Sequence, residues 1–352
     1  MNITLLAFAR HLAFSAGMAL VSAIMVRAMI SARMMDQPDP RKLHTTPIPR
    51  GGGLGVVVAF MLGVSVLYGF ASFSRLGEAY FRGVILASAT IAIVSFLDDI
   101  WDWPFVVKLA AQVLAAALAV GSGLYVSVYH LPWLGSYDLG AWGMVATGVW
   151  LVFATNAMNF LDGMNGLVAG TALVASLFLA LIAASQDGWF VYFASLLLAA
   201  GLVGFLPFNF PRARIFLGDV GSQFCGFVLA VLGVAAARFE QVEMSFLLVP
   251  MLLSGILYDA GFTLVRRCLA GNNPAQAHRG HLYQLAQRTG MDVRHIAMLH
   301  WGFAALGGLV ALAFIRVPGV GKPALLVALL LPQLGWTLLV LHRARRAAIG
   351  AW

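Results

Sequence analysis

Charged side chains are scarce in this sequence of 352 residues, because Asp, Glu, Lys and Arg together account for only 10% of it. Soluble domains usually carry about 25% charged residues. Hydrophobic residues make up 61% of the chain, and the mean hydropathy is +0.89. This composition excludes an ordinary cytosolic globular protein and predicts a protein that lies mostly within a lipid bilayer.

Cysteines, basic tracts and linkers are also rare. The two cysteines, Cys225 and Cys268, lie in or beside apolar stretches, so no disulfide framework is expected and both thiols should be free. The net charge of +8 comes from residues scattered between apolar runs, which argues against a nucleic-acid partner. Because no repeat, low-complexity segment or linker interrupts the chain, we expect one integral-membrane domain over residues 1–352.

Apolar runs dominate the sequence and predict an all-α polytopic membrane protein with about eleven transmembrane helices. The first run has no small-residue cleavage site and contains Arg10, so it should be a retained helix. A weak alternation over residues 126–139 suggests a short hairpin or an interfacial segment. The predicted spans are residues 3–26, 52–73, 81–97, 105–121, 143–158, 166–185, 189–206, 221–237, 244–265, 295–315 and 323–341.

The distribution of Lys and Arg predicts the orientation of the chain. One alternate set of loops holds fifteen of these residues and the other holds six, while Lys108 lies within a predicted span. Because cytoplasmic loops are enriched in Lys and Arg, the N-terminus should lie outside and the C-terminus in the cytoplasm. Nearly all clustered acidic and amide residues lie at the cytoplasmic ends of the spans, so we expect the functional site at this face.

Three carboxylates, Asp98, Asp99 and Asp102, lie within five residues at the end of the third predicted span. If the helix continues, Asp98 and Asp102 share a face. Crowded carboxylates repel one another, so the cluster needs a cation, and such oxygen ligands suit Mg²⁺ that bridges to phosphate. The alternative is a solvated helix end. Lys108 follows on the next span, where a snorkelling lysine is an equally good interpretation.

Four polar residues three apart form a second motif at the inner end of another span: Asn156, Asn159, Asp162 and Asn165. This spacing keeps successive side chains near one helical stripe. Amides and a carboxylate together could coordinate a metal and contact the edge of a nucleobase. Helix capping explains one such residue well, but four of them poorly.

The next inner loop, residues 209–222, contains Asp219 between glycines and beside a new helix N-terminus. An Asp at this position can hold a metal while backbone N–H groups meet a phosphate, although a simple N-cap is the alternative. The first inner loop adds Lys42 and Arg50. The enrichment of basic residues in cytoplasmic loops is by itself enough to explain their charge.

The longest polar stretch, residues 266–294, contains His278, Arg279 and His281. Two histidines separated by two residues are similar to a metal pair, yet no cysteine or further histidine nearby completes a zinc site. Contact with phosphate is therefore the better functional interpretation.

Taken together and in order, these motifs resemble those of the polyprenyl-phosphate N-acetylhexosamine-1-phosphate transferases, which are glycosyltransferases of family 4. The resemblance covers residues 36–288 and rests on four segments: Arg41 to Gly53, Asp98 to Asp102, Asn156 to Leu167, and Asn209 to Ser222. The loop with His281 lacks the His-His doublet of the peptidoglycan branch. It looks more like the branch that initiates O-antigen and related surface polysaccharides.

The resemblance assigns roles residue by residue. It implies a catalytic centre of Asp98, Asp99, Lys108, Asp162 and His281, with Lys108 near the lipid phosphate. It assigns Mg²⁺, for which Mn²⁺ could substitute, to Asn159 and Asp219. The implied substrate contacts are Asn165, Asn209, His278, Arg279, Lys42 and Arg50, with Asn165 near the uracil.

The implied reaction transfers an N-acetylhexosamine 1-phosphate from a UDP-sugar to undecaprenyl phosphate in the bacterial cytoplasmic membrane and releases UMP. The family also suggests a homodimer. The donor sugar, the downstream glycan and the choice between single and double displacement stay open. A membrane prenyltransferase is one alternative, although it normally needs two Asp-rich sites and only one is present. A transporter is another, although its charges would lie near the bilayer midplane rather than at one face.

Overall fold

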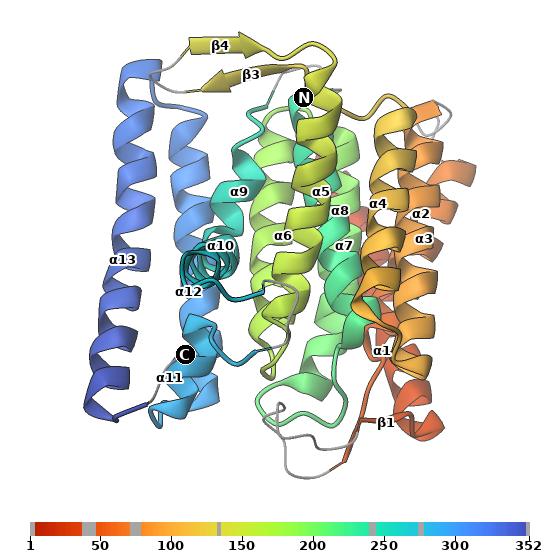
Figure 1. Ribbon diagram of the computed structural model, residues 1–352. Helices are drawn as coiled ribbons and strands as arrows, with labels where there is room; N and C mark the ends of the chain where they lie inside the picture. The colour runs from red at the N-terminus through yellow and green to blue at the C-terminus, as the bar shows by residue number, and fades with distance from the viewer. Residues whose placement is uncertain are drawn as a thin grey trace.

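The computed structural model describes residues 4–36, 47–70, 79–131, 135–238, 244–273 and 278–349. Within these residues, ten helices of 17 residues or more run side by side in one bundle (Figure 1). They are α1 (Leu5–Ala32), α2 (Gly53–Phe70), α3 (Ala79–Trp101), α4 (Phe105–Gly121), α5 (Trp142–Phe160), α6 (Leu167–Ser185), α7 (Trp189–Asn209), α8 (Gly218–Arg238), α12 (Val293–Phe314) and α13 (Lys322–Arg346).

These helices agree with the apolar runs of the sequence. Each of ten predicted spans coincides with one of them, and seven helices of the described chain are long and apolar enough to cross a membrane. Two of the other long helices are shorter in their apolar part: α2, over Gly53–Leu67, and α4. The protein is therefore an all-α polytopic membrane protein, and the number of eleven crossings stays a prediction.

Residues 244–265 differ from the single span that was predicted for them. They form α9 (Leu248–Leu252) and then α10 (Ser254–Leu269), which Figure 1 shows almost end-on, across the direction of the long helices. Composition explains this orientation, because α10 is amphipathic. It buries Asp259 and Thr263 on one side and exposes Leu264 and Leu269 on the other. Such a helix is unsuited to cross a bilayer alone.

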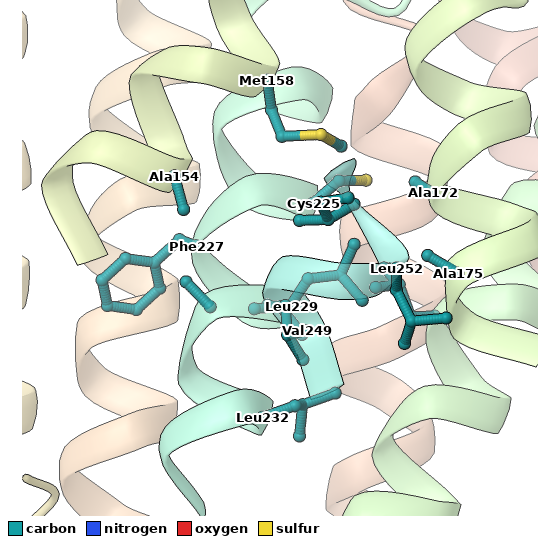
Figure 2. Packing of buried hydrophobic residues seen from close by; sticks show 14 of the residues in the cluster. Ala154, Met158, Ala172, Ala175, Cys225, Phe227, Leu229, Leu232, Val249 and Leu252 are labelled. Atoms are coloured by element: carbon teal, nitrogen blue, oxygen red, sulfur yellow. The ribbon is translucent and has the colours of Figure 1, made fainter. Parts of the chain in front are cut away.

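The helix α8 lies at the centre of the bundle, and nearly all of its residues are buried. It packs against α3, α5 and α2. Small residues allow the close approach, because a Cβ atom on Gly226 would lie 2.9 Å from Met158 Cβ. Figure 2 shows this packing through Ala154 and Met158 of α5, Ala172 and Ala175 of α6, Cys225, Phe227, Leu229 and Leu232 of α8, and Val249 and Leu252 of α9.

The remaining elements mark the two ends of the bundle. The strands β3 (Val128–Leu131) and β4 (Gly135–Asp138) form an antiparallel hairpin, which confirms the hairpin suggested for residues 126–139. At the opposite end lie the short helix α11 (Leu282–Arg288) and the strand β1 (Met35–Asp36), which pairs with β2 (Ile48–Pro49) (Figure 1). We call these two ends the hairpin end and the α11 end.

Candidate active site

A lysine bridges two carboxylates at the α11 end. Lys108 Nζ, in the first turn of α4, lies 2.6 Å from Asp98 Oδ2 and 2.9 Å from Asp219 Oδ2. Asp98 lies near the end of α3 and Asp219 in the first turn of α8, so three helices meet at this ion-pair cluster. The chain itself thus supplies the cation that the crowded acids require, and this geometry favours an ion-pair role for Lys108 over snorkelling.

Asp99 holds the start of α8. Its Oδ1 accepts a hydrogen bond from the backbone N–H of Asp219 at 3.0 Å, and its Oδ2 accepts one from Val220 at 3.1 Å. The first N–H groups of a helix have no helical partner, and the positive end of the helix dipole favours a nearby carboxylate. Gly218 permits this approach, because its φ is +76° and a Cβ atom there would lie 2.6 Å from Asp99 Oδ2. Asp99 therefore positions Asp219.

The third acid of the first motif, Asp102, lies beyond the end of the helix that carries the other two. The helix α3 ends at Trp101, and Asp102 has a φ of +53°. The predicted helical face shared by Asp98 and Asp102 is therefore absent. Two local features stop the helix: Asp98 Oδ1 accepts a hydrogen bond from the backbone N–H of Trp103 at 2.8 Å, and Pro104 follows.

An amide network supports Asp219 from the side of α5. Asn159 Nδ2 donates hydrogen bonds to Asp219 Oδ1 and to Ser222 Oγ, both at 3.0 Å. Gln223 Nε2 donates to Asp219 Oδ2 at 3.2 Å, and Gln112 Nε2 donates to Gln223 Oε1 at 2.9 Å. Sequence reasoning missed Gln112 and Gln223. The signal available was a polar amide inside an apolar helix, where uncompensated polar groups are costly.

The second motif forms only part of a helical stripe. The helix α5 ends at Phe160, so Asn156 and Asn159 share a helix while Asp162 and Asn165 follow in the loop. Asp162 is half-buried, and burial followed by the charges of Asp219 and Asp99 raises its pKa well above the usual range for an aspartate. The loop thus brings a fourth acid to the cluster.

A cavity of about 450 Å³ opens beside the cluster. It brings together most of the site residues that the sequence singled out, from segments far apart in the chain. Six carboxylates but only two basic side chains line it, so its wall carries a surplus of negative charge. The predicted residues in the wall are Arg50, Asp98, Asp99, Lys108, Asn159, Asp162, Asn165, Asn209 and Asp219, and Asp36, Asp102, Gln284 and Gln287 join them.

Asn209 has a structural task in this wall. Its side chain is buried, its Oδ1 accepts a hydrogen bond from the backbone N–H of Gly166 at 2.6 Å, and its Nδ2 donates to the carbonyl of Ile215 at 2.9 Å. It therefore ties the loop after α5 to the loop before α8. Arg50 forms an ion pair with Asp36, with Nη1 3.6 Å from Oδ1. Lys42 lies outside the described residues.

The loop before α11 leads directly into a helix that lines the cavity. Neither His278, Arg279 nor His281 belongs to the described lining, although Gln284 and Gln287 of α11 do. The rings of His278 and His281 stack with centroids 5.0 Å apart. Burial, followed by the charges of His281, Arg267 and Arg266, lowers the pKa of His278 to about 4. His278 is therefore neutral near pH 7.

The donor set of the wall fits a divalent cation. No three Asp, Glu, His or Cys side chains among the described residues form a complete metal cage. Mg²⁺ does not need one, because it usually takes one or two carboxylates together with water and substrate phosphate. Asp219, Asp162 and Asn159 all line the cavity and carry hard oxygen atoms of the kind that Mg²⁺ takes, and the surplus negative charge would attract the ion.

Residues 81–237 match the family model described as glycosyl transferase family 4. The chain is also 30% identical over 316 residues to the decaprenyl-phosphate N-acetylglucosaminephosphotransferase of Mycobacterium tuberculosis, an alignment that covers 81% of this chain and 78% of that protein. The chain belongs to glycosyl transferase family 4. The match contains Asp98, Asp99, Lys108, Asn159 and Asp219, so the ion-pair cluster lies inside the family's matched region.

Two further relatives show the range of this family. A probable undecaprenyl-phosphate N-acetylglucosaminyl 1-phosphate transferase of Bacillus subtilis is 28% identical, with 78% of this chain and 75% of that protein covered. A phospho-N-acetylmuramoyl-pentapeptide-transferase of Leuconostoc mesenteroides is 26% identical, with 79% and 88% covered. As a family 4 member, the protein is a membrane enzyme of the sugar-phosphate transferase kind. The O-antigen branch stays a prediction.

Proposed function

We propose that this family 4 enzyme transfers an N-acetylhexosamine 1-phosphate from a UDP-sugar to undecaprenyl phosphate, with release of UMP. The observation that carries the proposal is the convergence of Lys108, Asp98 and Asp219 beside an acid-lined cavity at one end of an apolar bundle. The names of two of these relatives support the acceptor, because they specify undecaprenyl or decaprenyl phosphate.

The chemistry requires one anion to attack another. An oxygen of the lipid phosphate forms a bond to the sugar-bearing phosphorus, the bond from that phosphorus to the bridging oxygen breaks, and UMP leaves with this oxygen. Mg²⁺, when bound by Asp219, Asn159 and Asp162, would offset the negative charge of the diphosphate. Lys108, whose Nζ lies between Asp98 and Asp219, also lines the cavity and supplies a fixed positive charge for the phosphate of the lipid.

The two adjacent aspartates have different tasks in this scheme. Both oxygens of Asp99 accept backbone N–H groups of α8, so Asp99 is poorly suited to take a proton. Asp98 holds Lys108 through Oδ2 and becomes available once an incoming phosphate competes for that ammonium group. We therefore assign removal of the last proton of the lipid phosphate to Asp98 rather than to Asp99.

The donor and the location follow from the loops. The excess of Lys and Arg in alternate loops supports a cytoplasmic α11 end, where UDP-sugars are available. The loop at His281 lacks a His-His doublet, and amides of Gln284 and Gln287 line the cavity instead. We therefore propose a simple UDP-N-acetylhexosamine or a deoxy derivative as the donor. The lipid-linked product would start a surface glycan such as O-antigen.

A direct transfer assay tests this proposal. Purified enzyme, radiolabelled UDP-GlcNAc, undecaprenyl phosphate and Mg²⁺ should yield a labelled lipid and UMP, EDTA should abolish the product, and Mn²⁺ should restore part of it. UDP-GalNAc, a 6-deoxy analogue and UDP-MurNAc-pentapeptide are compared in parallel. Preference for the pentapeptide donor would refute the branch. The absence of labelled lipid with every donor would refute the reaction.

The same preparation separates the alternatives. A prenyltransferase would consume a prenyl diphosphate and release pyrophosphate without any UDP-sugar. A transporter would accumulate the UDP-sugar inside proteoliposomes without forming UMP. Formation of UMP that depends strictly on undecaprenyl phosphate is expected only for the transferase.

A further inference from the structure

A buried aspartate outside the cavity anchors the loop that carries His281. Asp259, on α10, is 1% exposed. Its Oδ1 lies 3.1 Å from His281 Nδ1 and accepts a hydrogen bond from the backbone N–H of Leu282 at 3.0 Å. Its Oδ2 accepts one from the backbone N–H of Tyr283, also at 3.0 Å. Thr263, one turn further along α10, donates its hydroxyl to Oδ1 at 3.2 Å.

These contacts connect α10 to the wall of the cavity. Leu282 and Tyr283 are the first two residues of α11, so Asp259 satisfies N–H groups that have no partner within that helix. Tyr283 donates its hydroxyl to the carbonyl of Phe160, at the end of α5, at 3.1 Å. One turn of α11 beyond His281, Gln284 lines the cavity. The carboxylate therefore fixes α11 relative to both α10 and the cavity.

The carboxylate also fixes the imidazole of His281. An ionised carboxylate only accepts hydrogen bonds, so Nδ1 of His281 must carry a proton, and Nε2 is the remaining ring nitrogen. This nitrogen accepts a hydrogen bond when the ring is neutral and donates one when the ring is protonated. A ring fixed through Nδ1 presents Nε2 in one direction.

We propose that Asp259 is a positioning residue of the transferase site, which acts through His281 by holding Nδ1 so that Nε2 can meet the diphosphate or a sugar hydroxyl of the donor. This inference rests on the proposed function. Asparagine cannot replace Asp259, because its single oxygen cannot serve both sets of donors. In either orientation the amide NH₂ group would face an N–H group, either that of Tyr283 or those of Leu282 and His281.

A double-mutant cycle tests whether Asp259 acts through His281. We expect Asp259→Asn to lower kcat/KM for UDP-GlcNAc about tenfold or more, as loss of one charge-assisted contact does. In an enzyme that already carries His281→Ala, the same change should cost less than about threefold, because the imidazole that it positions is gone. Equal factors in both backgrounds would overturn the proposal. Asp138→Asn, on the exposed β4 strand at the hairpin end, is the matched control and should leave kcat/KM unchanged.

Thr263→Val covers the case in which Asp259→Asn fails to fold. It removes a single hydrogen bond to the same carboxylate and should lower kcat/KM about twofold to fivefold. The loss should again disappear in the His281→Ala background. A Thr263→Val enzyme with the same loss in both backgrounds would contradict positioning through the imidazole.

A spectroscopic measurement separates failure of this proposal from failure of the proposed function. In protein labelled with ¹⁵N-histidine, the signal absent from His281→Ala identifies this residue. We expect Nδ1 to be protonated in the wild type, and the proton distribution between the ring nitrogens to change in Asp259→Asn. An unprotonated Nδ1 in the wild type would overturn the positioning role. This readout holds for any reaction, so an enzyme without transferase turnover but with a protonated Nδ1 would refute only the proposed function.

Discussion

Replacement of Lys108 by methionine gives the sharpest test of the ion-pair cluster. Methionine keeps much of the side-chain volume and removes the charge that lies between Asp98 and Asp219 at 2.6 and 2.9 Å. Removal of one partner of a buried ion pair costs about 3–5 kcal/mol, because the other charge stays buried and unpaired. The side chain of Asp98 is 3% exposed, but that of Asp219 is 25% exposed. Water therefore screens part of the loss, and we expect about 2 kcal/mol of destabilisation.

The effect of Lys108→Met on activity should be larger than its effect on folding. If the ammonium group meets the lipid phosphate, its loss removes a charge-assisted contact of about 1.5–3 kcal/mol, or roughly 10-fold to 150-fold in kcat/KM. Turnover is measured as labelled lipid formed at increasing undecaprenyl phosphate, and folding as the thermal midpoint in detergent. A variant with more than half of the wild-type kcat/KM would refute the assignment of Lys108 to the substrate.

Two further variants distinguish chemistry from folding. In Lys108→Met combined with Asp98→Asn, one negative charge of the cluster is also removed, so the thermal midpoint should recover while turnover stays low. Lys322→Met is the matched control, since Lys322 lies at the hairpin end with its Nζ 4.7 Å from the ring centroid of Phe314. It should keep wild-type turnover. Recovery of turnover in the double variant would show that Lys108 acts only by relieving repulsion.

The remaining predictions concern orientation, metal and pH. With Cys268 replaced by serine, a cysteine introduced at Gln186 should react with an impermeant thiol reagent added outside, whereas one at Gly271 should not. Strong external labelling at Gly271 would show that the chain has the opposite orientation. Asp219→Ala should lower turnover at least about 100-fold at saturating Mg²⁺, equivalent to about 2.7 kcal/mol, with helix content unchanged; near-normal turnover would contradict its metal role. Because the pKa of His278 is lowered to about 4 in the folded chain, the unfolded chain binds protons more readily between about pH 6.5 and 4. The wild-type thermal midpoint should therefore fall from pH 7 to pH 5, and that of His278→Gln should fall less; equal falls would exclude this histidine as a cause.

The long helices and most of the cavity wall could be predicted from the sequence because both depend on local patterns. Apolar runs fix the helices, and an acid or amide at the end of such a run is conspicuous. The break between α9 and α10 could not be predicted by the same rule, because residues 244–265 are apolar enough on average. The buried side of α10 becomes apparent only when α11 supplies N–H groups to Asp259, which lies 23 and 24 residues away from them in the chain.

The different tasks of Asp98 and Asp99 also depend on tertiary structure. Neighbours in a helix point about 100° apart, so two adjacent acids are directed toward different surroundings. Asp98 faces Lys108 of α4, whereas Asp99 faces the N-terminus of α8. Sequence spacing predicts that their directions differ. It does not predict which of the two meets a cation and which meets a helix end, because those partners lie in other segments.

The acids at the α11 end explain how an apolar bundle can hold a charged site. The carboxylate of Asp99 accepts the first N–H groups of α8, and that of Asp259 accepts those of α11. A buried carboxylate costs several kcal/mol when it is alone, but charge-assisted bonds to two N–H groups and the positive end of a helix dipole offset much of this cost. The same bonds satisfy N–H groups that would otherwise be unpaired at the start of each helix. Each acid therefore stabilises the helix that carries the neighbouring site residue, Asp219 on α8 and Gln284 on α11. It follows that loss of activity in an Asp99 or Asp259 variant identifies a reacting group only if the helix start is shown to be intact.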